Sequence, residues 1–143
     1  MSPPMSPPMS TVRSPAIQAA ERIASEWAPT IGRISLGLVL AWFGYHELVQ
    51  PSLWTGYVPV LASSSAAAAV LVLIHGWVLL VLAVALVAGV TPRLAAAAAA
   101  LLLLQIVITL TITGGLSDLT MRDVGVLGLA LYLTGRNTHR LRI

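Results

Sequence analysis

Eight polar residues could do chemistry in this chain, and most of them stand close to long apolar segments. Ionisable side chains in such segments are costly and often mark function. Histidine changes charge between about pH 5 and 8, so a histidine beside a carboxylate can exchange protons with a bound hydroxyl compound. The candidate ligand-binding residues are His46, Glu47, His75, Gln105, Thr109, Asp118, Arg122 and Asp123.

The spacing of these residues argues against a metal centre. His46 and Glu47 are adjacent, so on a helix they point about 100° apart and chelate poorly together. The sequence has no cysteine and no His-x-x-x-His or Glu-x-x-His pair. A haem needs axial histidines at similar depth on facing helices, and His46 and His75 lie near the ends of their segments. We expect no metal, no covalently bound cofactor and no catalytic residue.

The elements that must position these residues are four apolar segments in a chain with 57% hydrophobic and 9% charged residues. A bilayer's hydrocarbon core needs about 20 apolar helical residues, and backbone groups inside it must be satisfied by helices or a closed barrel. We therefore predict an all-α integral membrane four-helix bundle. The segments are Ile31–Leu48, Ala66–Val90, Leu94–Ile112 and Val124–Leu133.

Two of the segments have individual features. The third opens with Leu94 and a run of alanines, and small residues allow close helix approach in membranes. The fourth has only ten strongly apolar residues. To cross a bilayer it must include 119–123 at one end and Thr134–Gly135 at the other.

The residues before the first span divide into two parts. Residues 1–13 include a proline-rich repeat, which favours disorder. Ser14-Pro15 has the signature of a helix start, and 14–28 is amphipathic, so we predict a short interfacial helix that ends at Pro29. The alternative is a helix extension packed on the bundle. The four-span domain then covers 29–136, and 137–143 form a basic tail.

Arginine placement predicts the topology. All eight basic residues are arginine, which together with abundant alanine is typical of a GC-rich bacterial genome. Seven of them fall on one side of the predicted spans, which places both termini in the cytoplasm of a multi-pass inner-membrane protein. The basic surplus then indicates contact with lipid headgroups and not with nucleic acid. The seven are Arg13, Arg22, Arg33, Arg93, Arg136, Arg140 and Arg142.

This topology gathers the candidate residues in the outer half of the bundle, where two interpretations compete. In one, Arg122 pairs with Glu47, Asp118 or Asp123, His75 bonds a neighbouring helix, and the network fixes packing. In the other, the residues line a pocket for an amphipathic ligand such as a quinone head group. An ion or solute path is a third interpretation.

The outer connection Gln50–Ser65 adds two aromatic residues near this cluster. Trp54 and Tyr57 suit the aromatic belt at the membrane interface. They could also cap a cavity, and we expect the belt role.

Three motifs resemble the DoxX family of membrane proteins. The first is Trp42–Leu48, reading WFGYHEL after Arg33 and Gly37; the second is GVTPRLA at Gly89–Ala95; the third is RDVGVLG at Arg122–Gly128. The likeness covers roughly residues 31–135 in the same four-span order. The family often has lysine where Glu47 stands, which reverses the charge at that position.

The resemblance implies a four-helix inner-membrane protein. One branch of the family resembles the small subunit of thiosulfate:quinone oxidoreductase, and other members are partners in redox complexes. We therefore expect an accessory or quinone-associated subunit of a membrane redox complex. Its candidate partners are membrane lipids, a quinone, an oxidoreductase subunit and further copies of this chain. The alternatives are an oligomeric small-solute or proton-coupled carrier and a purely structural membrane protein.

Overall fold

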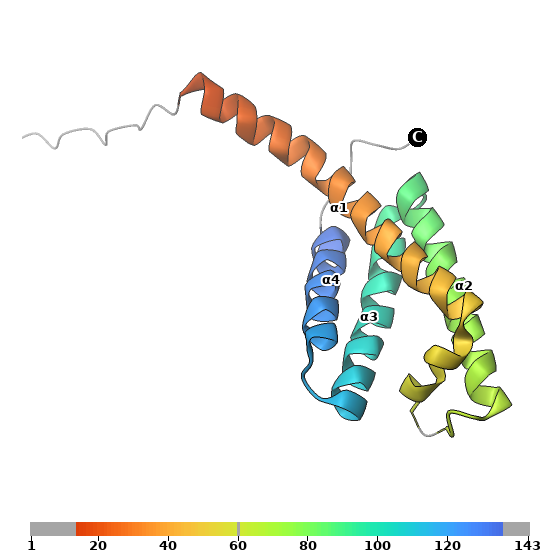
Figure 1. Cartoon of the computed structure of the whole chain (residues 1–143). Helices are drawn as coiled ribbons and strands as arrows, with labels where there is room; N and C mark the ends of the chain where they lie inside the picture. Colours follow the sequence, from red (N-terminus) through yellow and green to blue (C-terminus); the bar gives the residue numbers. More distant parts are fainter. Residues whose placement is uncertain (1–13, 60, 136–143) are drawn as a thin grey trace, which may run out of the picture.

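The computed structural model describes residues 14–59 and 61–135, and this part of the chain is all-helical (Figure 1). Two short 3-10 turns lie in the connection between the first two long helices. The elements in chain order are α1 (Pro15–Val49), η1 (Pro51–Leu53), η2 (Thr55–Tyr57), α2 (Ala66–Ala88), α3 (Pro92–Gly114) and α4 (Asp118–Gly135). The predictions for residues 1–13 and 137–143 concern residues outside the described part of the chain.

Helix α1 continues through Pro29, so it is longer than the apolar segment Ile31–Leu48. The predicted end of a separate helix at Pro29 is therefore wrong. Ser14 caps the helix through its hydroxyl, which accepts from the Ile17 amide, and Pro15 opens the first turn. Pro29 lies inside the helix. A proline within a helix removes one backbone hydrogen bond and bends the axis, and the helix-forming sequence on both sides tolerates that loss.

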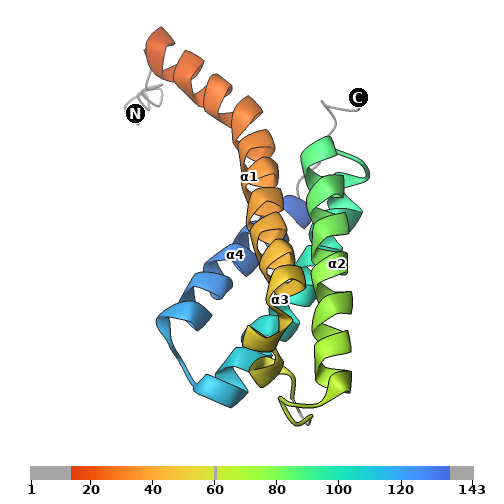
Figure 2. The same cartoon turned by 45° about the vertical axis from the view of Figure 1, so that its right-hand side comes forward.

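The first half of α1 therefore extends the first span without packing on the other helices. Residues 15–28 are exposed, and in both views this half projects away from the rest of the molecule (Figures 1 and 2). The first fully buried residue of α1 is Leu36. The interfacial placement of 14–28 stays a prediction.

The four long helices pack as two antiparallel pairs. Helix α1 lies along α2 (Figure 2), and α3 lies along α4 (Figure 1), while contacts between the pairs are less extensive. The side chains that α2 buries repeat every three or four residues, a spacing typical of supercoiled helix pairs. They belong to Ala68, Val72, Gly76, Leu79, Ala83 and Leu86. On α3 the buried set starts with alanines, as close approach requires: Ala95, Ala96, Ala99 and Ala100.

Glycines bring α1 and α2 unusually close. A methyl group at Gly44 would lie 2.7 Å from the Gly76 carbonyl oxygen, and one at Gly76 would lie 3.1 Å from the Gly44 carbonyl oxygen. A methyl group at Gly37 would lie 2.8 Å from Val87. Two backbones in direct contact hold the side chains beside them in one register.

The turn between α2 and α3 has two residues in the left-handed region, Gly89 with φ 76° and Thr91 with φ 41°. The Arg33 guanidinium lies directly against Gly89, at the end of α2. Arg93 donates from Nε to the Thr134 carbonyl at 3.4 Å, near the end of α4. Positive charge at helix C-termini offsets the negative end of the helix dipole, so both arginines stabilise this end of the molecule.

Helices α2 and α3 are each long and apolar enough to cross a membrane. Only 28% and 33% of their most apolar stretches are buried, so most of this apolar surface faces outward. Each has 23 residues, which corresponds to about 34 Å. Helix α4 starts at Asp118 and so includes the whole stretch before Val124. Its 18 residues correspond to a length of about 27 Å.

Candidate functional site

A cavity of about 420 Å³ lies between the two helix pairs, toward the end where the α1–α2 and α3–α4 connections are found. Its walls come from all four long helices and from the short segment after α1. Six of the eight predicted residues line it: Glu47, His75, Gln105, Thr109, Arg122 and Asp123. The sequence-based prediction of one shared polar region thus matches the geometry for these six.

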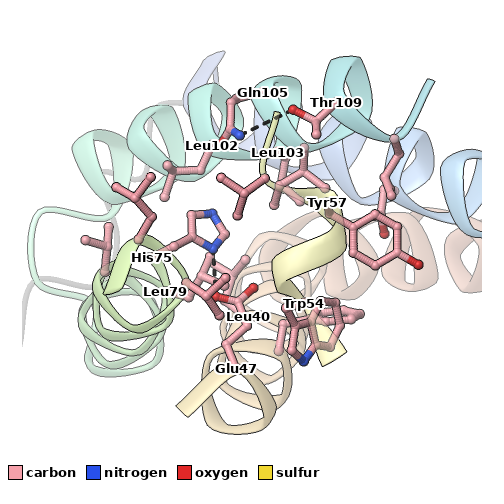
Figure 3. Close-up of a pocket in the computed structure, with 18 of the residues that line it drawn as sticks. Leu40, Glu47, Trp54, Tyr57, His75, Leu79, Leu102, Leu103, Gln105 and Thr109 are labelled. Carbon is pink, nitrogen blue, oxygen red and sulfur yellow. Dashed lines mark hydrogen bonds and ion pairs between the residues drawn. The ribbon is translucent and has the colours of Figure 1, made fainter. Parts of the chain in front are cut away.

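The centre of the site is a pair formed by Glu47 of α1 and His75 of α2. The distance between His75 Nδ1 and Glu47 Oε2 is 2.8 Å (Figure 3). Glu47 is only 5% exposed, so its carboxyl depends on this bond for much of its polar contact. His75 Nε2 is buried and has no hydrogen-bond partner. The pair therefore offers one unsatisfied nitrogen to its surroundings.

The backbone explains why these two side chains meet. Glu47 lies one turn beyond Gly44, and His75 directly precedes Gly76. Because Gly44 and Gly76 let the two helices touch, the side chains next to them reach each other without a bridging water. A methyl group at Gly76 would lie 3.0 Å from Glu47 Cβ. The contact that permits the pair is thus the same one that joins the helices.

A second charged pair lies on α4. Arg122 donates from Nε and Nη2 to Asp123 Oδ1, each at 3.0 Å. Asp123 is buried, whereas Arg122 is about half exposed. The guanidinium also stacks on the Phe43 ring of α1, 4.7 Å from its centroid. The prediction that Arg122 pairs with one of three carboxylates is thus resolved in favour of its sequence neighbour.

Helix α3 contributes neutral polar groups. Gln105 Nε2 donates to Thr109 Oγ1 at 3.5 Å, a long hydrogen bond (Figure 3). The Thr113 hydroxyl donates to the Thr109 carbonyl at 2.8 Å, so it satisfies its own helix and takes no part in the cavity wall. The α3 wall of the cavity therefore consists of leucines and an isoleucine with two neutral polar side chains, Gln105 and Thr109.

The two 3-10 turns after α1 close part of the cavity with aromatic side chains. Trp54 packs edge-on against Phe43 at 5.9 Å between ring centroids, and Tyr57 lies 6.3 Å from Trp54. Both line the cavity, in agreement with a cap role (Figure 3), and their place in an interfacial aromatic belt stays a prediction. Pro51 and Gly56 signalled a compact turn, but no pattern in the sequence showed which way its rings would face.

Two predicted residues lie apart from the cavity wall. His46 donates from Nδ1 to the Trp42 carbonyl at 2.8 Å and stacks on the Trp42 ring at 4.3 Å. Asp118 is exposed at the first turn of α4. Adjacency explains the first case: Glu47 faces α2, so His46 points about 100° away. Neither residue lines the cavity.

The chemistry available here is hydrogen bonding and proton exchange in a largely apolar space. Among residues 14–59 and 61–135, no three His, Asp or Glu side chains gather closely enough to hold a metal ion. No family model, curated protein or solved structure matches the chain. The resemblance to DoxX proteins stays a prediction that rests on the three motifs.

Proposed function

We propose that this chain is a DoxX-like integral membrane protein that binds a quinone head group as an accessory subunit of a redox assembly. The observation that carries the proposal is the cavity, where apolar walls surround a buried Glu47–His75 pair with one unpartnered nitrogen. Small-molecule sites are typically apolar with a few convergent polar groups. A quinone has the complementary composition, an apolar ring and tail with two polar oxygens.

The outward-facing apolar surface supports a membrane location. Large side chains on α2 and α3 are strongly exposed, among them Trp77, Val84, Leu101 and Ile112 at 61%, 69%, 70% and 77%. In water an apolar surface of this extent would drive association. Against lipid tails it carries no such penalty, so we place the four long helices across a bilayer.

The distribution of charge supports an orientation. Arg33 and Arg93 lie at the end that holds the α2–α3 turn, and the cavity lies toward the opposite end. Since cytoplasmic ends of spans are rich in arginine, the α2–α3 turn belongs in the cytoplasm together with both termini. The cavity then lies in the outer half of the bilayer, where a membrane-dissolved ligand reaches it laterally.

A purely structural role is the second candidate, and the charged pairs favour it. Glu47–His75 joins α1 to α2, and Arg122 connects Asp123 to the Phe43 ring of α1. Satisfied polar contacts of this kind fix helix packing without any ligand. The unpartnered nitrogens His75 Nε2 and Trp54 Nε1, both on residues that line the cavity, are what a structural role leaves unexplained.

Quinone retention separates the two candidates. The protein is purified in mild detergent, and native mass spectrometry measures bound quinone and copurifying subunits. We expect stoichiometric quinone or quinol in the wild type and in the control Val84→Ala, whose side chain is 69% exposed. His75→Phe removes the polar contact and should retain less of the ligand, whereas Leu102→Trp fills the cavity and should retain none.

The result that would overturn the proposal is equal retention in all four proteins, or phospholipid alone in the wild type. A copurifying oxidoreductase would support the accessory role. Ligand-dependent flux in liposomes that hold this chain alone would instead favour the carrier.

A further inference from the structure

The hydrogen bond with Glu47 determines whether the second ring nitrogen of His75, Nε2, carries a hydrogen. An ionised carboxylate only accepts hydrogen bonds, so His75 Nδ1 must carry the proton in the 2.8 Å contact with Glu47. A neutral imidazole has one N–H, so Nε2 is then a bare acceptor. Figure 3 shows this second ring nitrogen pointing away from Glu47, toward α3 and the Leu102 and Leu103 side chains that line the cavity.

A second proton on the pair reverses the character of that nitrogen. The pair then consists of an imidazolium beside a carboxylate, or of a carboxylic acid that donates to Nδ1. In both cases Nε2 carries the hydrogen and becomes a donor. The buried Nε2 atom thus accepts when the pair holds one proton and donates when it holds two.

The other ionisable groups around the cavity are Tyr57, Arg122 and Asp123. Arg122 and Asp123 are bonded to each other, with both guanidinium contacts on Asp123 Oδ1. Tyr57 is 41% exposed at the outer edge. Among the described ionisable groups of the cavity wall, Glu47–His75 is therefore the pair that combines burial with an unpartnered atom.

We infer that the cavity selects the reduced, hydroxyl-bearing quinol over the quinone while the Glu47–His75 pair holds one proton, and that a second proton abolishes this preference. The inference rests on the proposed function. A quinol hydroxyl donates to the bare Nε2, whereas a quinone carbonyl faces a lone pair and leaves two buried acceptors unpaired. When Nε2 carries a hydrogen it donates to the quinone carbonyl or to the quinol oxygen alike. The proton count of the pair and the oxidation state of the preferred ligand are thereby linked.

The test compares binding of decylquinol and decylquinone to the full-length protein in oxygen-free detergent buffer by equilibrium dialysis. At about pH 8.5 we expect the quinol to bind about tenfold more tightly or better, the effect of one buried hydrogen bond. At about pH 5.5, the second condition, the ratio of the two dissociation constants should approach one if the pair has taken up its second proton. The quinol dimethyl ether, which lacks the hydroxyl hydrogens, should follow the quinone.

Two variants sharpen the test. His75→Phe keeps a ring of similar size but removes both nitrogens, so the ratio should be near one at both pH values. Tyr45→Phe removes a hydroxyl from an exposed residue outside the cavity wall and should keep the wild-type ratio and its pH dependence. If His75→Phe does not fold, the dimethyl ether with the wild-type protein still decides the outcome.

The outcomes distinguish the two proposals. Quinol and quinone that bind the wild type with equal affinity at both pH values would overturn the selection by Nε2 and leave the quinone site standing. A wild-type protein that binds neither compound at either pH would overturn the proposed function itself.

Discussion

The close contact between Gly44 and Gly76 predicts that a larger residue at either position forces α1 and α2 apart. In Gly44→Ala the new methyl group would lie 2.7 Å from the Gly76 carbonyl oxygen, which belongs to the backbone and cannot rotate away. Carbon–oxygen contacts normally measure about 3.3–3.6 Å. The two helices must therefore separate by about 0.6–0.9 Å at this crossing.

That separation acts on both stability and the site. Overpacking of this kind costs about 1–3 kcal/mol in the free energy of unfolding. If the shift passes to the next turn, the 2.8 Å contact between His75 and Glu47 lengthens to about 3.4–3.7 Å, beyond a normal N–H···O bond. We therefore expect Gly44→Ala to lose quinone as well as stability.

The matched control is Gly128→Ala on α4, where an added methyl group meets nothing within 4 Å. Both variants gain the same preference of alanine for a helix, about 0.5–1 kcal/mol, so their difference isolates the steric term. The assay is reversible denaturation by sodium dodecyl sulfate in mixed micelles, followed by circular dichroism. Equal unfolding free energies for the two variants would refute the close approach of α1 and α2.

Three further predictions concern single contacts, each measured by the same denaturation assay. Arg122→Gln leaves the buried Asp123 carboxylate without its cation and should destabilise the protein by about 1–3 kcal/mol, whereas Arg122→Lys should recover part of the loss. Ala99→Leu adds bulk at a residue that has no exposed surface, so it should cost about 1–3 kcal/mol; a neutral result would contradict tight packing of α3 in the core. Ser65→Ala removes the hydroxyl that accepts from the Ala68 amide at 3.1 Å, and should cost about 0.5–2 kcal/mol, with Ser65→Asp as the rescue.

The helices themselves could be predicted from the sequence because apolar length and end signals are local properties. Ser65 caps α2, Pro92 opens α3, and Gly115 follows the last residue of α3, close to the predicted bounds. Pro29 is the exception, since a single proline ends some helices and only bends others. The outcome depends on what the flanking turns contribute, which no local pattern records.

The site was predictable in part for a similar reason. The order and direction of the helices place Glu47, His75 and Asp123 at comparable depth. Their position around one cavity could therefore be predicted from the number of spans. Rotation about each helix axis does not follow, and this is what separates Glu47 from His46. The caps from Trp54 and Tyr57 depend on an irregular connection, whose backbone path is set by tertiary contacts.

The division into two helix pairs has a mechanical consequence. The pairs α1–α2 and α3–α4 are joined covalently at the turn around Gly89 and Thr91, far from the cavity. The two pairs can therefore separate at the cavity end while they stay connected at the turn. Glu47–His75 lies within the α1–α2 pair and Arg122–Asp123 within the α3–α4 pair, so separation of the two pairs would break neither contact. It would break the stacking of Arg122 on Phe43, worth about 0.5–2 kcal/mol. If the proposed function holds, separation of the two helix pairs would let a quinone enter from the side while both charged pairs stay assembled.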